Sequence, residues 1–204
     1  MAQVKLIEEL KRRGYQVESF DTKQEVVDYM TGELTGQEIG IGGSLTVQEL
    51  GLEDTLRKEN KVFWHWNQPQ VEECGGPKAV RDHAMQTEVY ISSVNAIAET
   101  GEIINIDGTG NRIASLAYGH KKVYFIVGEN KIAKDFEAAM WRAKNIAAPL
   151  NAKRLNRKTP CAVKGDKCYH CNSPERICNG TLILERPMGG TEMIVVLVGE
   201  ELGA

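Results

Sequence analysis

The stretch Lys122-Val-Tyr-Phe-Ile-Val127 is a run of β-branched and aromatic residues, and it predicts a strand that is buried on both faces. A second such run, Met193-Ile-Val-Val-Leu-Val198, is long enough to sit centrally in a sheet. Strands of this kind occur in parallel sheets that helices cover from both sides. The two runs therefore favour an α/β fold.

Strand and helix patterns alternate through most of the rest of the chain. Further strands are expected at residues 15–20, 38–41, 61–66, 88–93, 102–106 and 181–184. Helices are expected at residues 4–13, 22–30, 44–50, 52–58, 78–87 and 135–147, the last ended by Pro149. This order predicts an open, mainly parallel, twisted sheet with helices on both faces. Residues 67–77 are expected to form a loop, because they contain two prolines.

Length and composition are those of one ordinary globular domain. The chain has 204 residues, of which 42% are hydrophobic, and a formal net charge of -3. This charge gives no support for a nucleic acid or a membrane surface as partner. Charges interrupt the apolar positions of the N-terminal helix, and no run approaches the ~20 apolar residues of a membrane span. We therefore expect a single cytoplasmic domain, residues 1–204, with a loop-rich excursion at residues 151–180.

A glycine turn, Gly40-Ile-Gly-Gly-Ser44, follows an expected strand and precedes an expected helix. Backbone N–H groups at such a turn favour carboxylate or phosphate groups, and hydroxyl groups add donors. The candidate ligand-binding residues here are Gly42, Gly43, Ser44 and Thr46. A plain tight turn, with Ser44 as the N-cap, explains the same residues, and the glycine spacing alone favours it.

A second polar segment, residues 95–112, brackets the expected strand at 102–106. Its candidate ligand-binding residues are Asn95, Thr100, Asn105, Asp107, Gly108, Asn111 and Arg112. Glu99 is the candidate catalytic residue, as a general base or a nucleophile, if it lies in a dry cleft. Arg112 is suited to a two-pronged contact with a carboxylate. Ordinary hairpin turns, with Asn111 as a helix cap, are the structural alternative.

Four of the five cysteines gather near the C-terminus, and they are the candidate metal ligands: Cys161, Cys168, Cys171 and Cys178. Four thiolates can hold one zinc ion or an iron–sulfur cluster. Their spacing contains one C-x-x-C pair and matches neither a zinc ribbon nor a bacterial ferredoxin run. Reduced structural thiols remain the alternative. Upstream, Trp64-His65-Trp66 suggests a stacking or hydrogen-bonding site at a strand end, although a histidine between aromatic residues is more often packed in a core.

Taken together, these residues resemble the LUD family, the lactate-utilisation domain. The matching stretches are Ile41–Thr46, Asn95–Gly101, Ile103–Arg112, Asn130–Ile132, Asn151–Leu155, Thr159–Cys161, Cys171–Asn179 and Val198–Gly203. The resemblance implies a fold similar to the sugar-phosphate isomerase and CoA-transferase group, with a ligand cleft at the strand ends. It also implies a link to bacterial lactate oxidation beside iron–sulfur partners.

Three hypotheses follow for the function. The first is a protein of organic-acid metabolism that binds a small anionic metabolite between the two glycine loops. The second is a transferase or isomerase that uses Glu99 as a nucleophile. The third is a non-catalytic scaffold, whose cysteine loop docks an iron–sulfur oxidoreductase subunit. Whether the protein is an enzyme stays open, as does assembly into a homo-oligomer.

Overall fold

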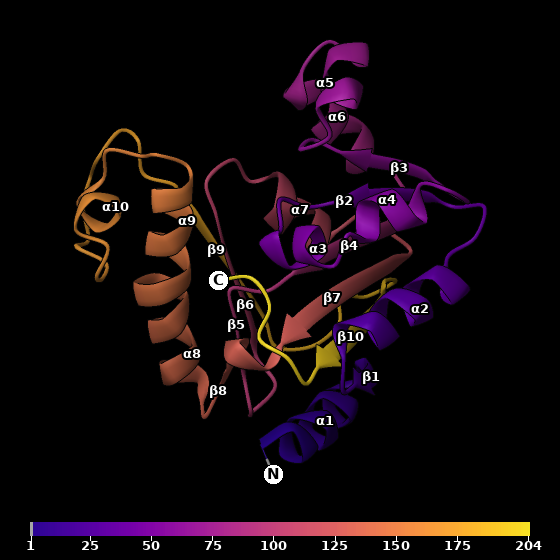
Figure 1. Ribbon diagram of the computed structural model, residues 1–204. Coiled ribbons are helices and arrows are strands. Elements are labelled where there is room, and N and C mark those ends of the chain that lie inside the picture. The colour runs from indigo at the N-terminus through magenta and orange to yellow at the C-terminus, as the bar shows by residue number, and fades with distance from the viewer. Residues whose placement is uncertain (1) are drawn as a thin grey trace.

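A six-stranded parallel sheet forms the centre of the computed structural model, which describes residues 2–204 except the side chain of Ala2 (Figure 1). The strands lie in the order β1 (Gln16–Phe20), β10 (Glu192–Val198), β7 (Lys122–Gly128), β4 (Val89–Ser93), β2 (Glu38–Ile41) and β3 (Lys61–Trp64). All five neighbouring pairs are parallel. The predicted open parallel α/β sheet is confirmed, including the interior places of β7 and β10.

Helices cover both faces of this sheet. On one face lie α2 (Lys23–Glu33), α3 (Leu45–Glu49) and α4 (Leu52–Leu56), and on the other lie α1 (Ala2–Arg13), α6 (Pro77–Ala84) and α7 (Asn111–Ala117). Side chains of β7 pack into the hydrophobic cores on both faces of the sheet. Tyr124 lies on the first side and Phe125 on the second, and each is almost fully buried. Burial on both faces explains why β7 has no polar alternation.

A smaller, four-stranded sheet lies beside the main one and was not predicted. Its order is β8 (Ile132–Ala133), β5 (Ala96–Ala98), β6 (Ile103–Asp107) and β9 (Gly180–Leu184). Strand β6 pairs antiparallel with both β5 and β9. Ile103 packs into the core of the main sheet, whereas Ile104 faces a separate apolar cluster under α8. The small sheet and α8 therefore add two layers to the helix–sheet–helix arrangement of the main sheet.

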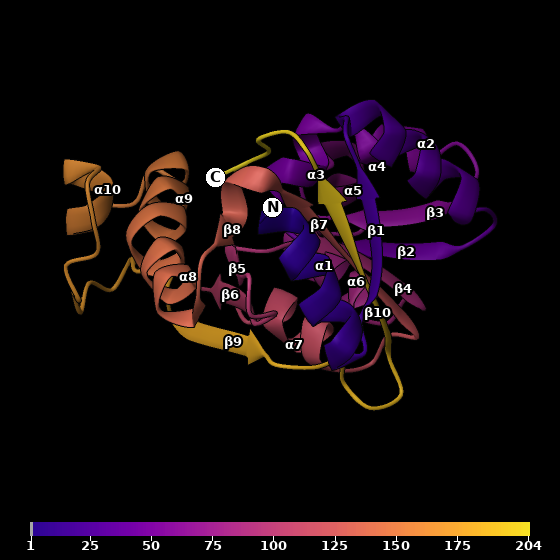
Figure 2. The same ribbon diagram turned by 90° about the horizontal axis from the view of Figure 1, so that it is seen from below.

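One long helical column covers the outer face of the small sheet (Figures 1 and 2). It consists of α8 (Phe136–Arg142), the π-helix η2 (Ala143–Ala147) and α9 (Ala148–Arg154). The prediction that Pro149 ends this helix was wrong. Pro149 lies in the first turn of α9, directly after the π-helix, where a proline is tolerated because the local hydrogen-bond register has already changed. The expected excursion at 151–180 therefore begins inside a helix, and it also contains α10 (Pro160–Lys164).

The segment expected to be a loop at residues 67–77 contains α5 (Gln68–Glu73). Asn67 caps this short helix by accepting the N–H of Gln70 at 3.0 Å, and Pro69 lies in the first turn. A proline there costs no intrahelical hydrogen bond, so the two prolines did not exclude a helix. A 3-10 turn, η1 (Glu129–Lys131), follows β7. No helix within residues 2–204 is long and apolar enough to cross a membrane.

A capping box is present at the start of α2. The Thr22 side chain accepts the Glu25 N–H at 3.3 Å, and the Glu25 carboxylate accepts the Thr22 N–H at 2.9 Å. We expect Thr22→Ala to lower the free energy of unfolding by about 1 kcal/mol, because the Glu25 N–H at the helix start loses its side-chain acceptor. Urea unfolding followed by circular dichroism measures the change. An unchanged midpoint would show that water replaces the cap at no cost.

Candidate functional site

A cavity of about 420 Å³ opens at the carboxyl ends of the main-sheet strands. We call it the arginine cleft. Three of its walls come from Gly43 after β2, His65 and Trp66 after β3, and the loop and helix start that follow β6. The remaining walls are part of α9 and residues 174–177, which lie between Cys171 and Cys178. A smaller recess of about 50 Å³ continues it towards Ser44, Ser93, Asn95 and Lys131. Gly43, Trp66, Arg112, Asn151 and Arg154 line both spaces.

The cleft lies where the strand order of the main sheet reverses. From β2 the chain continues outward to β3, whereas from β4 it continues through the small sheet to β7, on the opposite side. The connections that leave the carboxyl ends of β2 and β4 therefore run in opposite directions. Parallel α/β sheets bind ligands at such a reversal of strand order. Gly43 and Ser93 come from these two strand ends and face the same recess. Topology thus places the cleft where a ligand is expected.

The cleft is rich in cationic side chains: Arg81, Arg112, Arg154, Arg157 and Arg176. None of the five forms an ion pair within residues 2–204. The two carboxylates in the lining accept backbone N–H groups instead: Asp107 those of Thr109, Arg112 and Ile113, and Glu175 that of Lys158. The arginines consequently leave a concentrated positive charge, which suits an anion.

Arg112 is the most enclosed of these arginines. Its guanidinium donates to the Ile106 carbonyl and, at 3.2 Å, to Asn95 Oδ1. Burial lowers its pKa from the ordinary value, and the nearby Asp107 opposes that shift. A Cβ atom placed on Gly42 would lie 3.4 Å from Arg112 Cδ and 3.0 Å from the Ser92 and Tyr90 hydroxyl oxygens. Gly42 therefore allows Arg112 to pass close to the β2 turn.

Lys131, at the end of η1, lies at the floor of the recess and was not predicted. It is only 3% exposed, and its Nζ donates to Thr46 Oγ1 at 2.7 Å and to Ser93 Oγ at 3.0 Å. Burial lowers its pKa to about 7, with Arg142 and Arg112 adding to the effect and Glu49 opposing it. Lysines with lowered pKa values in clefts are typical of functional sites. Lys131 can therefore gain or lose its charge near neutral pH.

Two aromatic residues close the cleft on the β3 side. The Arg154 guanidinium lies 4.6 Å from the centre of the Trp66 ring, a cation–π contact that holds both groups over the opening. His65 is half-buried, and burial lowers its pKa to about 4, assisted by Arg81 and Arg154. His65 is therefore neutral at pH 7 and adds no charge to the cleft. Of the Trp64-His65-Trp66 run, His65 and Trp66 line this wall and Trp64 does not.

The cleft gathers most of the candidates from the two polar segments. Gly43, Ser44, Asn95, Asp107, Gly108, Asn111 and Arg112 all line it or its recess. Ser44 also caps α3 by accepting the Val47 N–H at 3.3 Å, so the structural interpretation of this residue holds as well. Thr46 is buried beneath the recess and contacts Lys131. The two glycine loops thus meet at one site, although they are far apart in the sequence.

Asn105 is also outside the cleft lining. It is fully buried in β6, and neither its Oδ1 nor its Nδ2 has a hydrogen-bond partner within residues 2–204.

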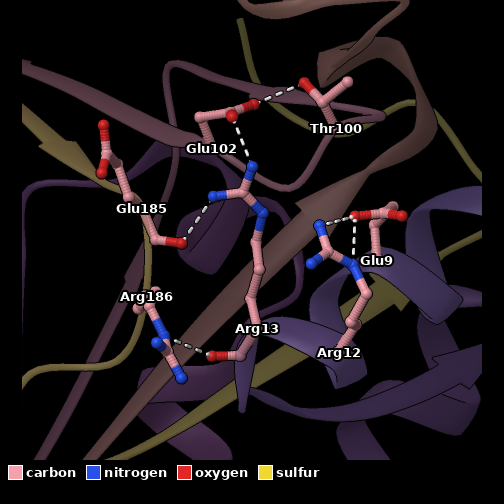
Figure 3. Close-up of polar contacts among 7 residues, drawn as sticks. All are labelled: Glu9, Arg12, Arg13, Thr100, Glu102, Glu185 and Arg186. Carbon is pink, nitrogen blue, oxygen red and sulfur yellow. Dashed lines mark hydrogen bonds and ion pairs between the residues drawn. The ribbon is translucent and has the colours of Figure 1, made fainter.

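Glu99 and Thr100 lie away from the arginine cleft, so Glu99 shares no cavity with Gly43. They form the β5–β6 turn, at the end of β6 opposite to Asp107. Glu99 Oε2 is 3.2 Å from Lys5 Nζ on α1, and neither residue lines either of the spaces that Gly43 lines. Figure 3 shows Thr100 bonded to Glu102, which pairs with Arg13 of α1. The turn is thus held by the N-terminal helix.

Glu99→Gln should therefore leave anion binding unchanged within about twofold. The change removes one exposed ion pair, which contributes little to stability in water. Isothermal titration with an anion that binds the wild-type protein measures the effect. A tenfold weaker affinity would indicate that Glu99 reaches the ligand in a conformation other than this one.

The four candidate cysteine ligands surround a second cavity, of about 290 Å³, which we call the cysteine cavity. All four are half-buried free thiols. Within residues 2–204 no three histidine, cysteine or acidic side chains are grouped closely enough to hold a single metal ion. Ile106, Arg176 and Ile177 line both the cysteine cavity and the arginine cleft. The two spaces therefore share a wall.

Comparisons with known proteins agree with this architecture. A crystal structure of a DUF162 family protein from Deinococcus radiodurans superposes with a TM-score of 0.54 at 12% identity, covering 97% of this chain and 95% of that one. At this identity the likeness concerns the fold alone. No curated protein matches the chain. The family model named LUD domain matches residues 4–198, nearly the whole chain, and the protein therefore belongs to the LUD domain family.

Proposed function

We propose that this LUD-domain protein binds a small anionic metabolite of organic-acid metabolism in the arginine cleft. The observation that carries the proposal is the set of five arginines without an ion pair, gathered at the strand-order reversal of the sheet. Arginine is suited to carboxylate and phosphate, because its planar fork donates two parallel hydrogen bonds. Arg112 and Lys131 would contact the anion from below, and Arg154 from the rim.

The size of the cleft favours a ligand with more than one anionic group. A volume of about 420 Å³ lies within the range of ordinary small-molecule sites. Arg81 and Arg157 line the wide part of the cleft, whereas Lys131 lines only the recess. A dicarboxylic or phosphorylated acid could engage both ends at once, whereas lactate would engage one. We therefore propose a di-anionic or phosphorylated organic acid as the preferred ligand.

A covalent role for Glu99 is not part of this proposal, because its carboxylate faces Lys5 outside the cleft. Participation in lactate utilisation and an iron–sulfur oxidoreductase partner, both implied by the family resemblance, stay predictions.

Thermal-shift measurements with matched ligands test the proposal. Ligand stabilisation grows as RT ln(1 + [L]/Kd), so millimolar concentrations reveal weak binding. We expect malate and phosphoglycolate to raise Tm more than lactate does, and lactamide, which has the shape of lactate without its charge, to have no effect. Equal shifts with lactate and lactamide, or no shift with any of the acids, would contradict an anion site.

A further inference from the structure

The cysteine cavity is a second candidate binding site, next to the arginine cleft. Besides the four cysteines its lining contains Lys144 and Arg176, and it contains no aspartate or glutamate. The cavity volume of about 290 Å³ is about ten times the roughly 30 Å³ that one water occupies in the liquid. Four cysteines therefore line a space much larger than a single ion, together with two cationic side chains.

The segment that carries these cysteines is held to the rest of the fold at Cys168 and again just after Cys178. The Cys168 N–H donates to Asn145 Oδ1 of the π-helix at 3.1 Å. After Cys178 the Asn179 N–H donates to the Asp107 carbonyl at 3.0 Å. A Cβ atom on Gly108 would lie 3.0 Å from the backbone of Ile177, so the two loops pack closely. π-helices occur frequently at functional sites, and this one supplies a wall of the cavity.

Three of the sulfur atoms already have polar contacts suited to thiolates. The His170 N–H donates to Cys168 Sγ at 3.4 Å, and the Arg176 guanidinium donates to Cys178 Sγ at 3.3 Å. The Thr159 hydroxyl lies 3.3 Å from Cys161 Sγ. Donors of this kind stabilise negative charge on sulfur and are a main means by which proteins tune metal–thiolate centres. Such contacts serve a thiolate ligand better than a neutral buried thiol.

We propose that the cysteine cavity holds a [4Fe–4S] cluster ligated by Cys161, Cys168, Cys171 and Cys178. A zinc ion requires its four sulfur ligands to converge within about 2.3 Å of one point. Within residues 2–204 no three such side chains converge as one ion requires, whereas all four cysteines line one cavity, and a cluster takes one thiolate at each of four separate corners. Lys144 and Arg176 offset the negative charge of the cluster and its thiolates. The shared wall of Ile106, Arg176 and Ile177 places this redox-capable group directly behind the arginine cleft.

Anaerobic reconstitution of the full-length protein with ferrous iron, sulfide and a thiol reductant tests the assignment. We expect brown protein with iron and acid-labile sulfide in equal amounts, and an electron paramagnetic resonance signal of a four-iron cluster after one-electron reduction. Protein that stays colourless and iron-free, or that takes up one equivalent of zinc in competition with iron, would overturn the proposal. So would a two-iron cluster. These measurements do not depend on the anion ligand, so they are independent of the proposed function.

Cysteine variants locate the cluster. Cys171→Ala and Cys178→Ala should each lose most of the iron and the visible absorption after reconstitution. Cys74→Ala is the matched control, because Cys74 lies outside the cysteine cavity and should retain the full iron content. Circular dichroism of the unreconstituted variants shows whether each one folds. A folded Cys171→Ala variant with wild-type iron, or equal losses in the Cys74 variant, would contradict the ligand set.

Discussion

Replacing Arg112 with glutamine should weaken the binding of an anionic ligand by roughly a hundredfold. Arg112 lines both parts of the cleft, and its guanidinium is held by the Ile106 carbonyl and Asn95 Oδ1. Removing one partner of an enclosed, hydrogen-bonded charge pair costs on the order of 3 kcal/mol, which is about two powers of ten in Kd. Isothermal titration with the best acid from the thermal-shift screen measures the loss.

Two further variants show that this effect belongs to the cleft. Arg12→Gln makes the same substitution on α1, where Arg12 pairs with Glu9 at the surface, and it should bind as the wild type does (Figure 3). Arg112→Lys keeps the positive charge but loses the two-pronged donor, so its affinity should lie between those of the wild type and Arg112→Gln. If folded Arg112→Gln bound the acid as tightly as Arg12→Gln does, the arginine cleft would not be the anion site.

The main sheet could be predicted from the sequence because each of its strands carries its own local signal. Strand β7 reads as buried on both faces, and Tyr124 and Phe125 indeed enter opposite cores. The small sheet gave no such signal, since β5 has three residues and β8 has two. Pairing with β6 makes them strands, and that pairing depends on the tertiary fold. Segments this short have no periodicity that sequence analysis can detect.

The candidate site was predicted in part, for a related reason. Gly43 and Arg112 belong to compact polar motifs, and they do meet in the cleft. Arg81, Arg154 and Arg176 lie on separate elements, and no spacing between them indicates a common site. Residues 151–158 are rich in lysine and arginine, but they show no clear helical periodicity in the sequence. The sequence therefore does not reveal that α9 extends to Arg154 and places its guanidinium over Trp66.

Glu99 shows the opposite case, because the structure places it outside the arginine cleft. Its motif suggested chemistry because several polar residues are adjacent in sequence. A β-hairpin separates them in space, with Glu99 at the turn and Asp107 at the far end of β6. Glu99 and Asp107 are close in sequence, but the five-residue strand β6 lies between them. Their carboxylates are therefore at opposite ends of that strand. Lys131, by contrast, lies in a three-residue turn without a motif, and only the fold brings it to Thr46 and Ser93.

Anion affinity should fall up to tenfold as the pH rises from about 6 to about 8.5, because Lys131 loses its charge in this interval. Burial holds its pKa at about 7, well below the ordinary value of 10.5. Below pH 7 the ammonium attracts the anion, and above pH 7 the neutral amine does not. The neighbouring arginines stay charged, and His65, with its pKa lowered to about 4, stays neutral throughout. Sulfate is a suitable probe, since its own charge does not change in this range.

The same titration affects stability, with a sign that follows from proton counting. Between pH 7 and pH 10.5 the unfolded chain keeps the Lys131 proton that the folded protein has released. Stability therefore rises with pH in this window through Lys131, while anion affinity falls. A bound anion favours the ammonium, so it should raise the pKa of Lys131. The affinity then falls between the pKa of the free protein and the higher pKa of the complex.

Lys131→Met separates this residue from every other titrating group. Methionine has a similar length and no charge, so the variant should bind sulfate weakly and with a flat profile from pH 6 to pH 8.5. Its thermal stability should also lose the rise above pH 7 that Lys131 contributes. A steep profile that persists in the folded variant would assign the titration to another group. A wild-type profile that is flat over this range would show that the Lys131 ammonium does not contact the anion.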